Sequence, residues 1–294
     1  MGRALFLLGA GCFWAVMMAQ LVRREVLPYF EFRDPPSYRS YLRTVSNPEV
    51  TKFAVTMSGA PVGEIESVVL PESDGGAQLR EWVRLEMPDA KGDKKTLVLA
   101  SRTTLGTDRR FLRYDSRATL VELPVPVSFV AVRNGNRMRV TLDAKFFRRD
   151  VDDIPFDDDA MLSDGIVPYF GGRLSVGKKW RVKTLDMRGV GAGGDAGRVS
   201  TTDLYATVEE RETILYQGRH VTCHKVFFRR RPTQDEEAMS HIVYVNDSGV
   251  VLAITLFVGR YVLDVRLADK RALPYEEARD WKTTVAMPAG FQQP

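Results

Sequence analysis

Cysteine and histidine are scarce in this sequence, and their scarcity excludes several kinds of protein. The 294 residues include two cysteines and three histidines, too few for a disulfide scaffold or a structural zinc site. The net charge is only +4, from 42 basic and 38 acidic side chains, so charge alone gives no indication of nucleic-acid binding. With 44% hydrophobic and 27% charged residues, the composition is that of a globular chain, neither disordered nor collagen-like.

Long uncharged stretches are also rare, and the one that exists lies at the amino terminus. The residues from Ala4 to Val22 carry no charge, with Gln20 as the one polar interruption. As a helix they would extend over roughly 28 Å, about the thickness of a hydrocarbon core. Arg23 and Arg24 follow at once and can reach the headgroups. The sequence therefore predicts a single-pass transmembrane signal anchor over residues 1–23.

Two alternatives to an uncleaved anchor remain open. Small residues within the apolar run allow a cleaved signal peptide. Cys12 after Gly9-Ala10-Gly11 suggests a lipoprotein cleavage site, although the apolar run continues well beyond this cysteine. The arginines after the span favour a cytoplasmic domain by the positive-inside rule, but large domains translocate largely regardless of charge. We expect the amino terminus inside and the carboxy-terminal domain outside the inner membrane.

The rest of the chain is dominated by an alternation of period two, which is typical of half-buried strands. A proline-containing stalk over residues 24–48 precedes it. Hairpins are predicted at Ser58-Gly59, at Asn134-Gly135 and at Gln217-Gly218. About a dozen strands over residues 49–271, with almost no helical pattern, indicate a mainly β fold. We expect a curved antiparallel sheet, as a partly open half-barrel or a sandwich.

Two segments interrupt or end this β domain. Residues 148–165 are rich in aspartate and are predicted to connect two halves of the domain. Residues 272–294 form a tail with one short helix expected around Tyr275 to Trp281.

Several strand and turn motifs resemble known exported proteins. Phe53-x-Val-x-x-x-Gly59-x-x-Val62-Gly63 looks like the opening hairpin of bacterial exported β proteins. Leu174-Ser-Val-Gly177-Lys-Lys-Trp180, Gly218-Arg-x-Val-x-Cys223-His-Lys225-Val and Ile242-Val-Tyr-Val-Asn-Asp-Ser-Gly249 follow it. They resemble envelope proteins of unknown function with a fold similar to the lipoprotein carriers LolA and LolB, and the β region that precedes transglutaminase-like domains in membrane-anchored proteins. The resemblance implies a curved sheet with an apolar concave face in the periplasm, and no catalytic residue.

Candidate catalytic and metal-binding residues are few. Cys223 and His224 are adjacent, so in a regular strand they point to opposite faces and cannot act as nucleophile and base. The aspartates of residues 150–164 lack the spacing of a calcium loop, and the glycines of residues 189–197 lack the lysine of a phosphate loop. We therefore predict no enzyme activity, no metal site and no cofactor.

Two basic clusters, Arg148-Arg149 and Arg229-Arg230-Arg231, end apolar strands. Cations at such positions protect sheet edges and can also contact anionic headgroups. No aromatic platform accompanies them in a nucleic-acid-binding module, so we expect no nucleic-acid partner.

The remaining candidate site is an apolar sheet face. Its predicted members alternate along the last strands and are Phe227, Val243, Val245, Leu252, Ile254, Leu256, Tyr261, Leu263 and Val265. Such a face either fills a core or, in an open sheet without a covering helix, binds an acyl chain. The sequence thus predicts a membrane-anchored periplasmic binding or scaffold protein whose ligand is a lipid or a lipidated protein. The alternative is a structural subunit of an envelope assembly with no small ligand, and an unrecognised hydrolase is the third hypothesis.

Overall fold

The computed structural model describes residues 2–22, 42, 45–88, 92–120, 123–144, 147–156, 170, 173–186, 200–232, 239–258 and 261–281. These residues form one 14-stranded antiparallel sheet and two helices, α1 (Gly2–Leu21) and α4 (Tyr275–Asp280). The strands are β1 (Glu49–Met57), β2 (Ala60–Pro71), β3 (Ala77–Pro88), β4 (Lys94–Leu105), β5 (Phe111–Leu120), β6 (Leu123–Asn134), β7 (Arg137–Ala144), β8 (Phe147–Pro155), β9 (Lys179–Asp186), β10 (Ser200–Tyr216), β11 (Arg219–Arg229), β12 (Met239–Asn246), β13 (Val251–Val258) and β14 (Tyr261–Ala272).

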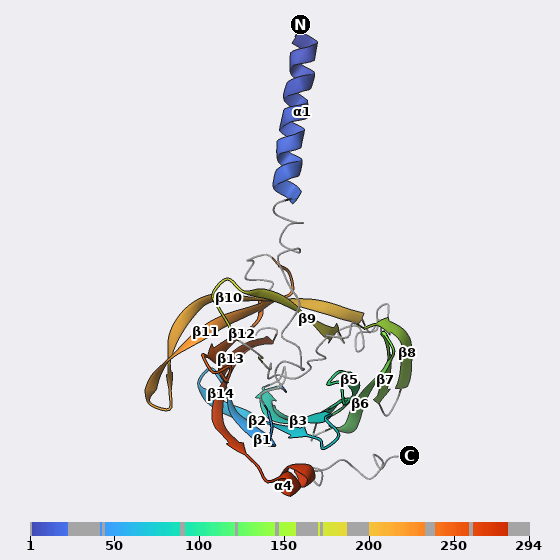
Figure 1. Cartoon of the computed structure of the whole chain (residues 1–294), viewed down its shortest axis with the longest axis vertical. Helices are drawn as coiled ribbons and strands as arrows, with labels where there is room; N and C mark the ends of the chain where they lie inside the picture. Colours follow the sequence, from blue (N-terminus) through green and yellow to red (C-terminus); the bar gives the residue numbers. More distant parts are fainter. Residues whose placement is uncertain are drawn as a thin grey trace.

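The strand order places the two ends of the β domain side by side. It runs β8-β7-β6-β5-β4-β3-β2-β1-β14-β13-β12-β11-β10-β9, so β1 and β14 pair in the middle while β8 and β9 form the two edges. The sheet curls into an incomplete ring (Figure 1), in which β8 comes into contact with β10. The predicted mainly β fold, a curved antiparallel sheet in a partly open barrel, is confirmed.

Tight turns explain why consecutive strands pair. At Gln217 and Gly218 the φ angles are 48° and 74°, the positive pair of a type I′ turn. The β6–β7 turn differs from the prediction, because Asn134 pairs with Arg137 and the central residues are Gly135 and Asn136. Only the glycine has positive φ there, which matches type II′.

Gly63 is required for a different reason. It lies beside a register irregularity in β2, and a Cβ at this position would collide with the carbonyl oxygen of Arg84 on β3. Any larger residue would push these two strands apart.

Part of the predicted connector is instead a strand. Its described residues belong to β8, which pairs with β7 from Ala144↔Phe147 to Arg137↔Pro155. Asp157, Asp158, Asp159 and Asp164 lie outside the described residues. The first part of the aspartate-rich segment therefore forms an edge strand of the sheet.

The two helices have different surroundings. Ala278 of α4 is buried in a small cluster on β1 and β2 with Val50, Val68, Leu70 and Leu273, and the predicted carboxy-terminal helix is confirmed. The large apolar side chains of α1 from Phe13 to Leu21 are exposed instead, for example Phe13 at 69% and Trp14 at 65%. Within the part of the chain that the structure describes, no helix combines the length and apolar character needed to cross a membrane.

Candidate functional site

The inner face of β9–β14 is the region where most of the predicted site residues lie. Pairing aligns Val243 with Ile254, Ile254 with Val265, and Leu256 with Leu263. Six of the nine residues are buried in the main hydrophobic cluster, namely Val243, Val245, Leu252, Ile254, Leu263 and Val265. Leu256 and Tyr261 are half-buried. The apolar face predicted from alternation therefore exists, and its described members are largely core.

Phe227 does not belong to this inner face, which corrects the sequence prediction. On β11 it is Val226 that pairs with Val243 and Phe228 that pairs with His241, while Phe227 pairs with Ile242 on the opposite face. Two cations flank the Phe227 ring, with Lys225 Nζ at 5.3 Å and the Arg229 guanidinium at 4.9 Å from its centroid. Which of the two adjacent phenylalanines points inward depends on how β11 pairs with its neighbours, and the sequence of one strand does not reveal this.

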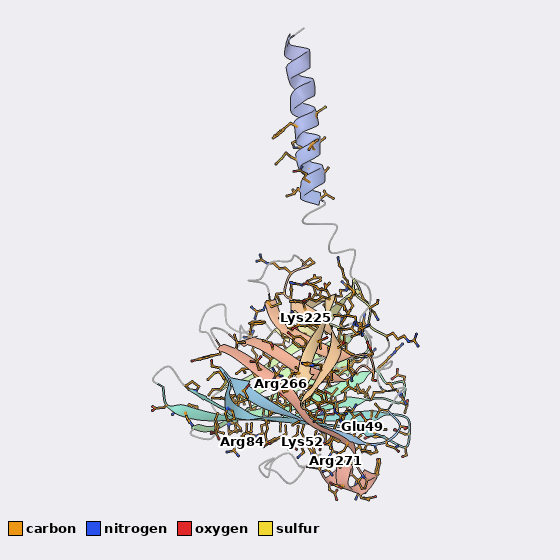
Figure 2. The ribbon with its side chains drawn as sticks, turned by 90° about the vertical axis from the view of Figure 1, so that its left-hand side faces the viewer. Glu49, Lys52, Arg84, Lys225, Arg266 and Arg271 are labelled. Atoms are coloured by element: carbon orange, nitrogen blue, oxygen red, sulfur yellow. The ribbon has the colours of Figure 1, made fainter. Side chains whose placement is uncertain are left out.

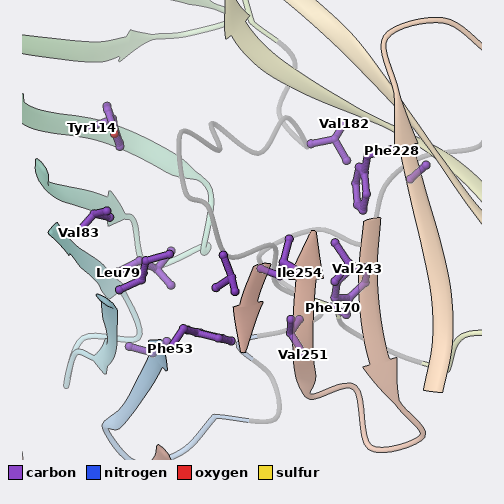
Figure 3. Packing of buried hydrophobic residues seen from close by; sticks show 14 of the residues in the cluster. Phe53, Leu79, Val83, Tyr114, Phe170, Val182, Phe228, Val243, Val251 and Ile254 are labelled. Atoms are coloured by element: carbon purple, nitrogen blue, oxygen red, sulfur yellow. The ribbon is translucent and has the colours of Figure 1, made fainter. Parts of the chain in front are cut away.

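An aromatic cluster that was not predicted from the sequence occupies the inner face beside these residues. Phe170, Trp180 and Phe228 meet edge to face, with ring centroids 6.0 to 6.4 Å apart. Phe228 also stacks on His241 at 4.2 Å. Figure 3 shows Phe228, Phe170, Val243 and Ile254 gathered on one side of the interior. Trp180 after the Gly177 turn was the available sequence signal for this cluster.

His241 is a neutral group inside this cluster. Burial lowers its pKa from 6.5 to about 4, because an apolar environment disfavours the charged imidazolium. Its Nδ1 atom lies 3.2 Å from the hydroxyl of Ser240. At neutral pH the imidazole therefore packs as an uncharged ring.

The opposite wall of the interior is partly polar. Buried Ser67 on β2, Ser101 on β4 and Ser116 on β5 lie in one row of the sheet, with Glu81 of β3 between the first two. Figure 3 shows Leu79, Val83 and Tyr114 on this side, facing the aromatic cluster. The interior thus has an apolar wall and a wall that includes hydroxyl groups.

Residues from outside the regular strands pack between these walls. Leu42, Phe156 and Phe170 are buried to 2%, 1% and 5% exposure, and Phe156 lies 5.1 Å from the ring of Phe111. All three belong to the same cluster as the strand residues. The described interior is therefore packed with the chain's own side chains.

The surroundings of Cys223 and His224 are those of structural residues. Cys223 is buried, and burial followed by the Asp247 carboxylate raises its thiol pKa, which disfavours the reactive thiolate. His224 Nε2 lies 3.2 Å from Asp247, whose two carboxylate oxygens each accept a hydrogen bond from Arg211 at 2.8 Å. His220 is exposed at the hairpin end. No group of three or more metal-ligating side chains occurs among the described residues.

The predicted basic clusters are only partly exposed. Arg229 is buried, and its Nη1 atom pairs with Glu209 at 2.6 Å, whereas Arg230 and Arg231 are exposed. Arg148 is exposed and lies 3.6 Å from Asp150. Arg229 therefore stabilises the sheet and is not available as a surface cation.

Matches to this chain were found among solved structures. No protein-family model and no curated protein matches the chain. The crystal structure of a β-barrel-like protein of a domain of unknown function (DUF1849) from Brucella abortus is similar to it, with a TM-score of 0.49 and 10% sequence identity. The similarity covers 78% of this chain and 98% of that chain. The resemblance to lipoprotein carriers and to transglutaminase-associated β regions stays a prediction.

Proposed function

We propose that this chain is a non-enzymatic scaffold protein of the bacterial envelope, held in the inner membrane by α1 with its β domain in the periplasm. One contrast supports the proposal. The apolar side chains of the inner wall are used in the core, while those of α1 from Phe13 onward are exposed, including Val16 at 56% and Leu21 at 53%. Exposed apolar side chains along a helix that carries no charge after Arg3 favour a lipid environment.

Lipid binding on the inner wall, the leading prediction from the sequence, is not part of this proposal. Six of its nine residues are core, and side chains from other segments pack against them. The scaffold hypothesis needs no internal ligand and places the contact with a partner on the outer face of the sheet.

Fractionation of cells that produce the full chain tests the anchor. The protein should stay with membranes through an alkaline carbonate wash, and Val16→Arg/Met17→Arg should release it, because arginine near the centre of a span is costly. The matched control is Leu215→Arg/Val262→Arg, which changes two exposed apolar residues of the β domain and should leave the protein in the pellet. Release of the wild type, or retention of the helix variant, would contradict anchoring by α1.

The side of the membrane can be tested with a single labelled cysteine. In a Cys12→Ser background, Ser248→Cys places a thiol in the exposed β12–β13 turn, while the buried Cys223 serves as the unreactive control. A membrane-impermeant maleimide should label Ser248→Cys in cells whose outer membrane alone is permeable. Labelling only after complete lysis would place the domain in the cytoplasm and overturn the periplasmic assignment.

A further inference from the structure

The outer face of β3–β5 carries an unusual concentration of arginine. Strand register places Arg80 beside Arg102, Arg102 beside Asp115, and Trp82 and Arg117 on either side of Ala100. These residues and the other outward arginines of the three strands form a surface that we call the arginine face. It consists of Arg80, Arg84, Arg102, Arg113 and Arg117, with Trp82 among them. The outward carboxylates of the same strands are Asp115 and Glu86, which pairs with Arg84 at 3.3 Å. On the neighbouring β2, Glu64 lies across from Arg84 and Glu66 across from Trp82. The five arginines still outnumber these four carboxylates. Figure 2 shows Arg84 on the outside of the ribbon.

Asp115 shows how this face holds a carboxylate. Its side chain is only 1% exposed. Arg113 donates to it from Nε at 2.9 Å and from Nη2 at 2.7 Å, and Arg102 Nη2 lies 3.5 Å away. The hydrogen bond to Asp115 raises the pKa of Arg113. Two guanidinium groups thus converge on one carboxylate, with the forked geometry that arginine prefers for this group.

Arg80 shows that the arginines are kept close at an energetic cost. It lies directly across from Arg102, and like charges in this position destabilise a sheet. Burial, and next the charge of Arg102, lower the pKa of Arg80. Its hydrogen bonds go to the uncharged oxygens of Gln78 and of the Arg279 main chain. Glu72 and Asp280 offset part of this repulsion, and a further carboxylate brought from outside would relieve more of it.

We propose that the arginine face binds a carboxylate-rich segment of a partner protein, with Trp82 packing against that segment. The proposal rests on the scaffold function and names the partner's chemistry. Arginine and tryptophan are the residues most enriched at the energetic centres of protein interfaces. A protein segment is favoured over a lipid surface because arginines and a tryptophan lie together on this face and because the carboxylate it already holds, that of Asp115, is a protein side chain. The guanidinium fork fits phosphate as well as carboxylate, so the test includes lipid vesicles.

Binding of a fluorescein-labelled decaglutamate peptide tests the proposal. The full chain is placed in nanodiscs of zwitterionic lipid, and fluorescence anisotropy gives Kd at two salt concentrations. Arg84→Gln/Arg117→Gln should weaken binding at least about tenfold, since close charge pairs across an interface contribute strongly. The control Arg219→Gln/Arg266→Gln removes the same charge from exposed positions on β11 and β14 and should change Kd less than about twofold.

A second variant separates fork geometry from charge. Arg84→Lys/Arg117→Lys keeps both charges but removes the planar fork, and we expect an intermediate loss of affinity. Circular dichroism and thermal unfolding establish that each variant is folded. Absence of peptide binding, or an equal loss in the control variant, would overturn the proposal.

A binding measurement with lipid vesicles decides whether the arginine face contacts a protein segment or a membrane. If the chain binds vesicles of anionic phosphatidylglycerol through the same arginines and does not bind the peptide, the face contacts lipid and the proposal is wrong. Peptide binding that depends on Arg84 and Arg117 supports it. The anchoring test is independent of this result, so a released chain with intact peptide binding would contradict the membrane scaffold while supporting the arginine face.

Discussion

The two inner walls of the curled sheet differ in the side chains that they bury. The inner wall of β9–β14 carries Trp180 at 1% exposure and Phe228 at 3%, together with the aliphatic residues around them. The inner wall of β2–β5 has buried Ser67, Ser101 and Ser116 in the corresponding interior position. Both walls bury aliphatic side chains, Ile65 and Leu79 among those of β2–β5, and apolar burial is the main stabilising contribution to folding. The row of serines is therefore where we expect the two walls to differ in their contribution to stability.

The outer faces of the same two regions differ in charge. On β10–β11, Lys225 pairs with Glu210 at 3.0 Å and Glu212 at 2.8 Å, and Arg229 pairs with Glu209. On β3–β5 the arginines outnumber the carboxylates. In the proposal above, β3–β5 is the part of the outer face that meets a partner.

The largest effect should come from removing an aromatic ring on the inner wall of β9–β14. Trp180→Ala removes a ring in contact with both Phe170 and Phe228 and should lower the free energy of unfolding by about 3–5 kcal/mol. On the other wall, Ser67→Ala removes a hydroxyl that has no hydrogen-bond partner among the described residues. It should be neutral or stabilise by up to about 1 kcal/mol. Urea unfolding of both variants measures the difference, and equal losses would show that the walls contribute alike.

An acid-dependent loss of stability should come from His241 on the same wall. The folded state holds its pKa near 4, against 6.5 as the ordinary value, so below pH 6.5 the unfolded chain binds a proton that the folded chain does not. The contribution is present above pH 6.5 and is lost as the pH falls towards 4, by up to about 3 kcal/mol.

The carboxylates also titrate in this range, so the comparison between variants isolates the histidine. His241→Phe keeps a ring against Phe228 and should flatten the fall in unfolding free energy between pH 6.5 and pH 4. His220→Gln, at an exposed position, should leave the wild-type pH dependence unchanged. If His241→Phe retains the full dependence, carboxylates alone cause it and the wall is not sensitive to acid through this residue.

The fold could be predicted from the sequence because its signals are local. Alternation identified most of the strands but not β4, β5 or β8. Paired positive φ angles at Gln217 and Gly218 form the hairpin that the sequence predicted. The face of Phe227 could not be predicted in the same way. Register irregularities interrupt β10 between Val208 and Glu210 and displace the β11 pairing at Arg229, so counting by two along one strand does not reveal which phenylalanine points inward.

The arginine face could not be predicted from the sequence for a similar reason. The sequence places Arg80, Trp82 and Arg84 on one face of a strand by alternation alone. It does not show that Arg102 and Arg117, from the following strands, join them, because this depends on the register across β3, β4 and β5. When residues from different strands form one surface only through strand pairing, no pattern in the sequence shows that they belong together.

The smallest of the three effects should come from Asp115, and it tests the charge comparison directly. Asp115→Asn leaves Arg102 and Arg113 without their shared carboxylate and should lower the free energy of unfolding by about 1–2 kcal/mol, since hydrogen bonds to charged groups contribute this much. The partial exposure of both arginines, 32% and 48%, keeps the loss below that of a fully buried pair. The matched change on the balanced face is Glu212→Gln, where Lys225 keeps Glu210 and the cost should stay under about 0.5 kcal/mol. If decaglutamate binds the arginine face, Asp115→Asn should also tighten that binding, because two guanidinium groups are released for the peptide. A loss of stability without tighter binding would mean that Asp115 and its arginines form a closed structural unit, and the arginine face would then be reduced to Arg80, Arg84 and Arg117.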